Sequence, residues 1–166
     1  MTHAKREDII KRIRKAFLGV ERPPDEKLLH FPNTGGELWV DRFLGTTETD
    51  WIDISPENVA HECWALTVLS PPAFAYYLPA YVTWVLKNYD VCSSSTLDHT
   101  LYDLDLTGRD ENTRSMMEQR FSVLTEEQGQ AVLEFLKYMI GIKGIDSKAA
   151  RDAIASYWDK FEEGKT

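Results

Sequence analysis

The side chains best suited to chemistry stand together at His61-Glu62-Cys63. A zinc-protease helix needs a second histidine four residues after the first, and Ala65 occupies that position. Other metal ligands would have to come from single residues at irregular spacing, which are His30, Cys92 and His99. Because no regular ligand spacing is present, the sequence predicts no metal site.

A catalytic thiol needs a histidine base within hydrogen-bond reach. The sequence offers two such pairs, Cys63 with His61 and Cys92 with His99. Residues two apart on a helix point to different faces, and neither thiol stands in a pattern that lowers its pKa. Walker A, dinucleotide-binding, nucleophile-elbow and EF-hand patterns are also missing. We therefore expect structural cysteines, no catalytic residue and no cofactor.

Acidic side chains flank Gly108 on both sides, at Asp98, Asp103, Asp105, Asp110 and Glu111. Paired carboxylates can do acid–base work or hold Mg²⁺, and Asp103 and Asp105 would share a face only in an extended segment. A solvated acidic loop explains the same residues. In that interpretation, Asp103 and Asp105 are candidate contacts for a basic partner.

Residues 63–86 contain no charged side chain, so they form either a membrane span or the core of the fold. About 20 apolar residues suffice to cross a bilayer. However, Pro71, Pro72 and Pro79 divide the run into shorter pieces, and its tyrosines stand in the middle rather than at the edges. The sequence predicts two buried helices that meet at a Ser-Pro turn, with no membrane contact.

The second of these helices carries an aromatic stripe. Tyr77 and Tyr81 share one helical face, while Tyr76 falls on the other. A buried tyrosine hydroxyl needs a hydrogen-bond partner, so the stripe is either plain core or the lining of a pocket. In the pocket interpretation, the candidate binding residues are Tyr76, Tyr77 and Tyr81 together with Trp51 and His61.

Start and stop signals predict the remaining elements. Helices are expected at 4–18, 37–43, 56–69, from 71 onward, before 125, at 126–140 and from 147. Pro79 either kinks its helix or ends it near Tyr77. Thr125 and Gln128 form a capping box. We expect an all-α fold of six or seven helices, in which residues 101–106 form either a minor short strand or a turn that leads into a helix. It forms a single compact domain over 1–166, in which 141–166 is an appended C-terminal helix.

Charge and cysteine content narrow the function classes. The net charge of −8 and the pI near 5.0 argue against binding to nucleic-acid phosphates. Basic side chains concentrate in residues 1–22, whereas residues 46–107 are acidic apart from Lys87. Either the basic first helix lies against an acidic body, or that body meets a basic partner. Two cysteines and an N-terminus without an apolar run indicate a cytoplasmic protein.

The segment at 69–81, LSPPAFAYYLPAY, resembles the hallmark of a bacterial family of small uncharacterised proteins, a domain of unknown function. Other parts of the resemblance are Phe43-Leu44-Gly45 with Trp51, and Leu124–Gln128 with Phe135–Tyr138. The resemblance covers residues 9–140 and implies a small, soluble bacterial domain. It carries over no catalytic residue and implies no substrate.

These observations favour a function in binding rather than catalysis. We expect a protein that recognises another protein, with a basic partner as the more specific form of the prediction. The alternative is a small-molecule-binding protein or enzyme with a pocket beside the Tyr76–Tyr81 helix. Exposed aromatic residues such as Trp39 or Trp158 would equally suit a homodimer face.

Overall fold

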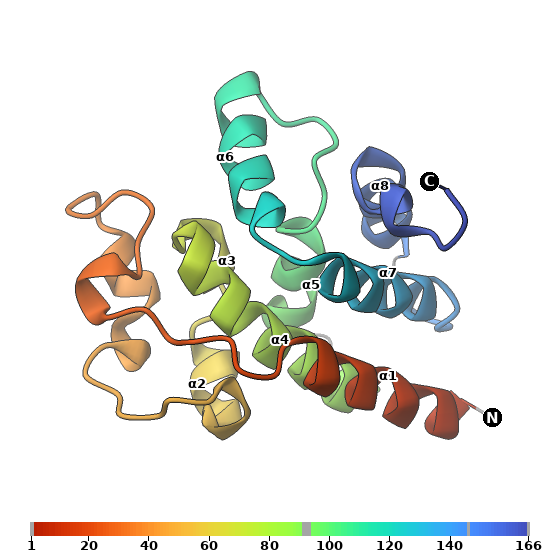
Figure 1. Ribbon diagram of the computed structural model, residues 1–166, viewed down its shortest axis with the longest axis horizontal. Helices are drawn as coiled ribbons and strands as arrows, with labels where there is room; N and C mark the ends of the chain where they lie inside the picture. Colours follow the sequence, from red (N-terminus) through yellow and green to blue (C-terminus); the bar gives the residue numbers. More distant parts are fainter. Residues whose placement is uncertain (1, 91–93, 146, 166) are drawn as a thin grey trace.

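The chain folds into α-helices joined by turns and loops, with a long segment of short 3-10 turns between the first two α-helices (Figure 1). The computed structural model describes residues 2–90, 94–145 and 147–165. Its α-helices are α1 (Thr2–Ala16), α2 (Pro56–His61), α3 (Ala65–Val68), α4 (Pro71–Asn88), α5 (Ser95–Tyr102), α6 (Glu111–Ser122), α7 (Glu126–Ile140) and α8 (Lys148–Ser156). Its 3-10 helices are η1 (Asp25–Lys27), η2 (Gly36–Trp39), η3 (Asp41–Phe43), η4 (Trp51–Asp53) and η5 (Trp158–Phe161). The all-α prediction is confirmed, although the described residues hold eight α-helices rather than six or seven.

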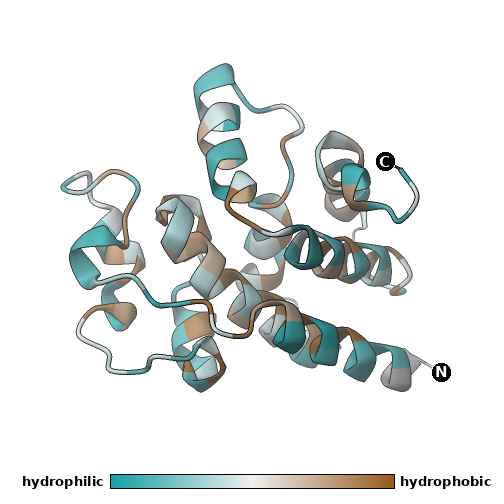
Figure 2. Ribbon diagram, in the orientation of Figure 1, coloured by the Kyte–Doolittle hydropathy of each residue, from teal (hydrophilic) through white to brown (hydrophobic). Residues whose placement is uncertain are grey.

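Helix α4 forms the centre of the core. Ser70 caps it by accepting a hydrogen bond from the Ala73 N–H, and prolines fill the first turn, where no N–H is needed. Figure 2 shows hydrophobic residues toward the middle of the molecule and hydrophilic ones on the outward side of α1 and α7. The helix continues through Pro79, which excludes one of the two alternatives, the stop near Tyr77. Packing on all sides of α4 outweighs the hydrogen bond that proline cannot donate.

The helix predicted over 56–69 is divided into α2 and α3. The break occurs at Glu62, which leaves the helical conformation with φ −87° and ψ 48°. The buried Glu62 carboxylate accepts a hydrogen bond from the Arg42 N–H at 3.1 Å, and the Glu62 carbonyl accepts one from the Tyr81 hydroxyl. These tertiary hydrogen bonds replace the ones that a continuous helix would make.

Of the two alternatives for residues 101–106, the strand does not form and a turn is present. Helix α5 extends to Tyr102, and the chain then turns so that the Leu104 N–H donates to the Leu101 carbonyl at 3.2 Å. Within the described residues β pairing is limited to an isolated bridge between Leu29 and Leu69. The apolar residues of the alternating segment are still buried, because turns as well as strands can direct side chains into a core.

Residues 20–54 form short 3-10 turns that pack against α2, α3 and α4. The short helix expected at 37–43 is present as η2 and η3. Arg22 fastens the segment by donating to the Phe43 carbonyl at 2.7 Å, to Asp25 at 2.7 Å and to the Tyr77 hydroxyl at 3.2 Å. One guanidinium thereby holds three separate parts of the chain together.

The basic first helix lies against α7. Arg12 forms an ion pair with Glu134, and Lys15 pairs with Glu127 at 3.7 Å. These glutamates belong to α7 and not to the acidic stretch at 46–107, against which the basic helix was expected to lie. The capping box at the start of α7 is present as predicted. Along the described parts of the chain, no helix has the combination of length and apolarity that a bilayer span requires.

The C-terminal elements α8 and η5 pack onto α7. Trp158 is fully buried and donates its indole N–H to the Leu104 carbonyl at 2.9 Å. The rings of Phe121 and Phe161 lie 4.9 and 5.9 Å from it, centroid to centroid. Gly129 of α7 is in contact with Phe161, and a methyl group there would collide with that ring. The chain therefore forms one compact domain around a common core.

Candidate functional site

The three tyrosines predicted as pocket lining lie in the core. Tyr76, Tyr77 and Tyr81 are fully buried. The Tyr81 hydroxyl donates to the Glu62 carbonyl, and the Tyr77 hydroxyl accepts from Arg22. Burial raises the pKa of Tyr77 to about 12 and holds the pKa of Tyr81 well above its ordinary value. The structure thus brings the three tyrosines together as packing groups.

Trp51 and His61 lie in different surroundings. Trp51 is buried, donates its indole N–H to the Phe17 carbonyl at 3.1 Å and lines a small cavity of about 80 Å³ beside α4. His61 is exposed at the end of α2, where its Nδ1 lies 3.1 Å from Glu62 Oε1. These two side chains therefore do not share one site.

Asp103 and Asp105 are also separated. Asp105 accepts hydrogen bonds from the Thr107 N–H at 2.8 Å and the Ser156 hydroxyl at 3.4 Å. Asp103 is only 5% exposed, and its two oxygens share the Thr67 hydroxyl at 2.9 and 3.0 Å. Burial raises the pKa of Asp103 to about 7, against the opposing influence of Thr67. Asp103 is thus an interior carboxyl group rather than part of a solvated acidic loop.

Four rings from three separate elements form a surface that the sequence did not predict. Trp39 ends η2, Trp64 precedes α3, and His99 and Tyr102 belong to α5. Ring centroids are 5.6 Å apart for Trp39 and Trp64, 3.4 Å for Trp64 and His99, and 6.5 Å for His99 and Tyr102. Trp39, Trp64 and Tyr102 are 40%, 43% and 49% exposed. We refer to these four residues as the aromatic surface.

A pocket of about 400 Å³ adjoins the aromatic surface, with Trp64 and Tyr102 in its wall. The remaining lining includes polar and apolar side chains from α3, α6 and the loop between α5 and α6, among them Thr67, Asp103, Arg109, Met116, Met117 and Arg120. The Arg109 guanidinium lies 3.5 Å from the centroid of the Tyr102 ring, a cation–π contact. The pocket therefore combines aromatic walls with charged groups.

Arg120 is the second buried charge in this pocket. It is 2% exposed and donates to the carbonyls of Leu69 and Thr67 at 2.6 and 2.7 Å. Burial lowers the pKa of Arg120 to about 10, while the nearby Asp103 acts in the opposite direction. Its hydrogen-bond partners among the described residues are these neutral carbonyls, and Asp103 acts on its charge through space without a direct ion pair.

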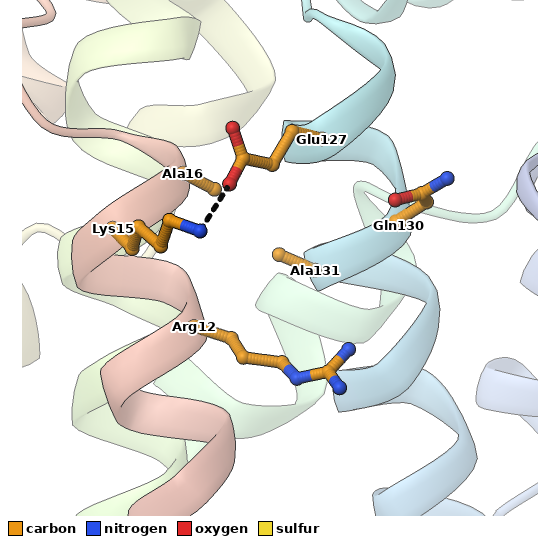
Figure 3. A pocket seen from close by; sticks show the side chains of 6 residues that line it. All are labelled: Arg12, Lys15, Ala16, Glu127, Gln130 and Ala131. Atoms are coloured by element: carbon orange, nitrogen blue, oxygen red, sulfur yellow. Dashed lines mark ion pairs between the residues drawn. The ribbon is translucent and has the colours of Figure 1, made fainter.

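A second hollow, of about 240 Å³, lies between α1 and α7 (Figure 3). Arg12 and Lys15 reach across from α1, and the ion pair between Lys15 and Glu127 spans the hollow. Arg12 is likewise paired with Glu134 of α7. Because the charges of the two walls pair with each other, we interpret this hollow as the seam between two packed helices.

The geometry around His61-Glu62-Cys63 gives no support to thiol or metal chemistry. Cys63 is half-buried, and burial raises the pKa of its thiol, which disfavours the reactive thiolate. Within residues 2–90, 94–145 and 147–165, no group of three His, Cys, Asp or Glu side chains is placed to hold a metal ion. Cys92, the other thiol considered from the sequence, lies outside the described residues.

Comparison with protein families matches residues 5–162 to a family described as "Family of unknown function (DUF6714)". The chain belongs to this family. The match extends to residue 162, beyond the range of 9–140 over which the resemblance was seen in the sequence. It thus includes α8 and η5 in addition to every residue of the aromatic surface and its pocket. Searches among curated proteins and solved structures found no significant match.

Membership of DUF6714 assigns no ligand, so the candidate site of this DUF6714 chain is inferred from the geometry of the chain alone. Trp39 and Trp64 stand in short irregular segments, where hydrophobic periodicity does not tell an exposed ring from a buried one. Arg120 belongs to a helix whose sequence is mostly polar, so its burial leaves no sequence signal. The usable signal lay within the LYDLDLTGR segment, which contains both Tyr102 and Arg109.

Proposed function

We propose that the chain binds another protein through the aromatic surface. The observation that carries the proposal is the continuous row of half-exposed rings at Trp39, Trp64 and Tyr102. Tryptophan and tyrosine dominate the binding energy at the centres of protein interfaces, because each buries a large area while losing little conformational freedom. Single exposed apolar residues are common on any protein, but a joined group of rings is not.

Charge supports a basic partner. The net charge of −8 attracts basic proteins over distances comparable to the Debye length. Exposed indole faces also bind lysine and arginine side chains, a contact worth about 0.5–2 kcal/mol. Arg109 makes the same kind of contact with Tyr102 within the chain. The proposed contact thus moves from Asp103 and Asp105 to the aromatic surface, because Asp103 is buried.

The test uses three forms of the protein as bait, each purified gently from its own host and weighed by native mass spectrometry. They are the wild type, the double variant Trp39→Ser/Trp64→Ser, and the control Ile52→Ser/Val123→Ser, which alters exposed residues outside the aromatic surface. We expect the wild type and the control to retain a basic polypeptide at fixed stoichiometry. The aromatic variant should lose it while keeping its helical circular dichroism spectrum.

Other outcomes would overturn the proposal. A polypeptide that all three baits retain would place the contact elsewhere, and an acidic polypeptide would contradict the charge argument. A wild-type mass equal to two chains, abolished in the aromatic variant, would assign the surface to a homodimer. If all three samples contained only a single chain with no bound polypeptide, the proposed protein contact would be contradicted.

We further propose that the protein works in the bacterial cytoplasm. The support is the pair of cysteines, which are too few for a disulfide framework, together with the LSPPAFAYYLPAY segment. Cell fractionation of the host followed by immunoblotting tests the location. Recovery in the extracytoplasmic fraction would contradict it.

The alternative small-molecule site beside the Tyr76–Tyr81 helix has less support. The hydroxyls of Tyr77 and Tyr81 are already engaged with Arg22 and Glu62. The cavity of about 80 Å³ beside Trp51 is also far below the roughly 300 Å³ at which small-molecule pockets begin. A pocket of suitable size lies instead at Asp103 and Arg120.

A further inference from the structure

The pocket beside the aromatic surface holds two buried charges that the proposed protein contact does not use. Asp103 and Arg120 both line it, and both are more than nine-tenths buried. Asp103 is hydrogen-bonded to the neutral Thr67 hydroxyl, and Arg120 donates to two backbone carbonyls. Asp103 and Arg120 act on each other through space but form no direct ion pair, so a ligand with a group of opposite charge in direct contact with each would offset part of the cost of burying it.

The mixture of charges in the pocket selects for a ligand that carries both signs. Arg109 and Arg120 would repel a simple cation. Asp103 and Asp110 would repel a simple anion. A zwitterion avoids both penalties, because its ammonium group can pair with the Asp103 carboxylate and its carboxylate with a guanidinium.

The size and the walls of the pocket narrow the ligand further. A volume of about 400 Å³ is in the lower part of the range for small-molecule sites, roughly 300–1,000 Å³. Trp64, Met116 and Met117 add aromatic and thioether surface to the lining, which suits an apolar group of adaptable shape. The ligand should therefore be small and should carry an apolar group beside its two charges.

We infer that this pocket binds a free α-amino acid with an apolar side chain. Its ammonium group pairs with Asp103, and its carboxylate pairs with Arg120 and Arg109. The pocket shares Trp64 and Tyr102 with the aromatic surface, whereas Trp39 belongs to that surface alone, so a Trp39 variant separates amino-acid binding from the proposed protein contact.

The first test removes charges from the ligand, which leaves the fold untouched. Isothermal titration calorimetry is run with L-leucine, L-methionine and L-phenylalanine as probes, and then with the amide and the des-amino acid of the tightest binder. The amide lacks the carboxylate and the des-amino acid lacks the ammonium group. We expect each change to weaken binding by roughly tenfold to a hundredfold, as for the loss of a charge-assisted hydrogen bond.

The second test removes charge from the protein. Asp103→Asn should weaken amino-acid binding by about tenfold or more, because the ammonium group loses its ionic partner. The matched control is Asp105→Asn, two residues away, whose carboxylate is bonded to Thr107 and Ser156 and is not part of the lining. Asp105→Asn and Trp39→Ser should both bind the probe as the wild type does. Circular dichroism establishes that each variant is folded.

Three results would overturn the inference. The first is no binding heat from any of the three amino acids at about 10 mM, a concentration that reveals a Kd of roughly 1 mM. The second is a des-amino acid that binds as tightly as its amino acid. The third is equal loss of binding in the Asp103 and Asp105 variants. Loss of the protein partner in the Trp39→Ser variant would support the proposed protein contact and would leave the inferred amino-acid site unaffected.

Discussion

Asp103 lies on the inner side of a segment in which apolar and acidic residues alternate. Groups from three parts of the chain act on it: Thr67 of α3, Arg109 of the following loop and Arg120 of α6. Each of them favours the ionised carboxylate, yet burial outweighs them and raises its pKa to about 7. A carboxyl group of this kind makes stability depend on pH.

The direction of that dependence follows from the protons bound. In the unfolded chain the pKa of Asp103 returns to about 3.9, so between about pH 4 and pH 7 the folded state holds a proton that the unfolded state has released. The free energy of unfolding therefore falls as the pH rises through this window, by at most about 4 kcal/mol. We expect Asp103→Asn to remove this decline, so that the variant gains stability over the wild type between pH 5 and pH 8.

Urea denaturation of both proteins at pH 5 and pH 8 measures the effect. The difference between variant and wild type at each pH cancels the contributions of other titrating groups, including His30 and His99, whose pKa values burial lowers. A difference that is the same at both pH values would show that Asp103 titrates normally.

Among the elements, α7 is the one whose boundaries follow most directly from its residues. The Thr125 hydroxyl accepts a hydrogen bond from the Gln128 N–H at 3.2 Å, and the Gln128 side chain accepts one from the Thr125 N–H at 2.9 Å. The helix α2 has a similar start at Ser55-Pro56, but its serine side chain makes no capping hydrogen bond. The two helix starts look alike in sequence and differ in structure.

This difference predicts unequal effects of removing the two hydroxyl groups. Thr125→Ala should lower the free energy of unfolding by about 1 kcal/mol, since it leaves an N–H of the first turn without its partner. Ser55→Ala should change it by less than about 0.5 kcal/mol, as for other surface substitutions. Chemical denaturation of the two variants gives both values. Equal losses would show that Ser55 caps α2 in solution.

At the scale of the whole molecule, the C-terminal segment and the rest of the chain share one core. Trp158 is fully buried and bonded to Leu104, which lies more than fifty residues earlier in the chain. The family match likewise includes this segment. If 141–166 were instead an appended helix, the remaining helices would stay folded without it.

Replacement of Trp158 distinguishes a shared core from an appended C-terminal helix. We expect Trp158→Ala to lower the free energy of unfolding by about 3–5 kcal/mol and to unfold all helices in one transition. Native-state hydrogen exchange followed by mass spectrometry should then show protection falling together in α1, α4 and α7. Loss of protection confined to α8 and η5 would instead establish an appended segment.

Much of the fold could be predicted because its signals are local. The uncharged run at 63–86 identified the central helix, and the capping box identified the start of α7. The predicted helix boundaries were wrong where contacts with residues distant in the sequence override the local helix preference. Glu62 breaks a helix because its partners come from Arg42 and Tyr81, and packing carries α4 through Pro79.

The sequence by itself determined the helical class, the buried helix at the centre, most helix starts and the acidic charge. These depend on residue type and on spacing within one or two turns. Only the tertiary structure decided that the tyrosines of α4 are packing groups, that Asp103 and Arg120 share a pocket, and that Trp39, Trp64 and Tyr102 form one surface. The physical reason is that burial and contact between distant segments depend on how the helices pack, which no local spacing records.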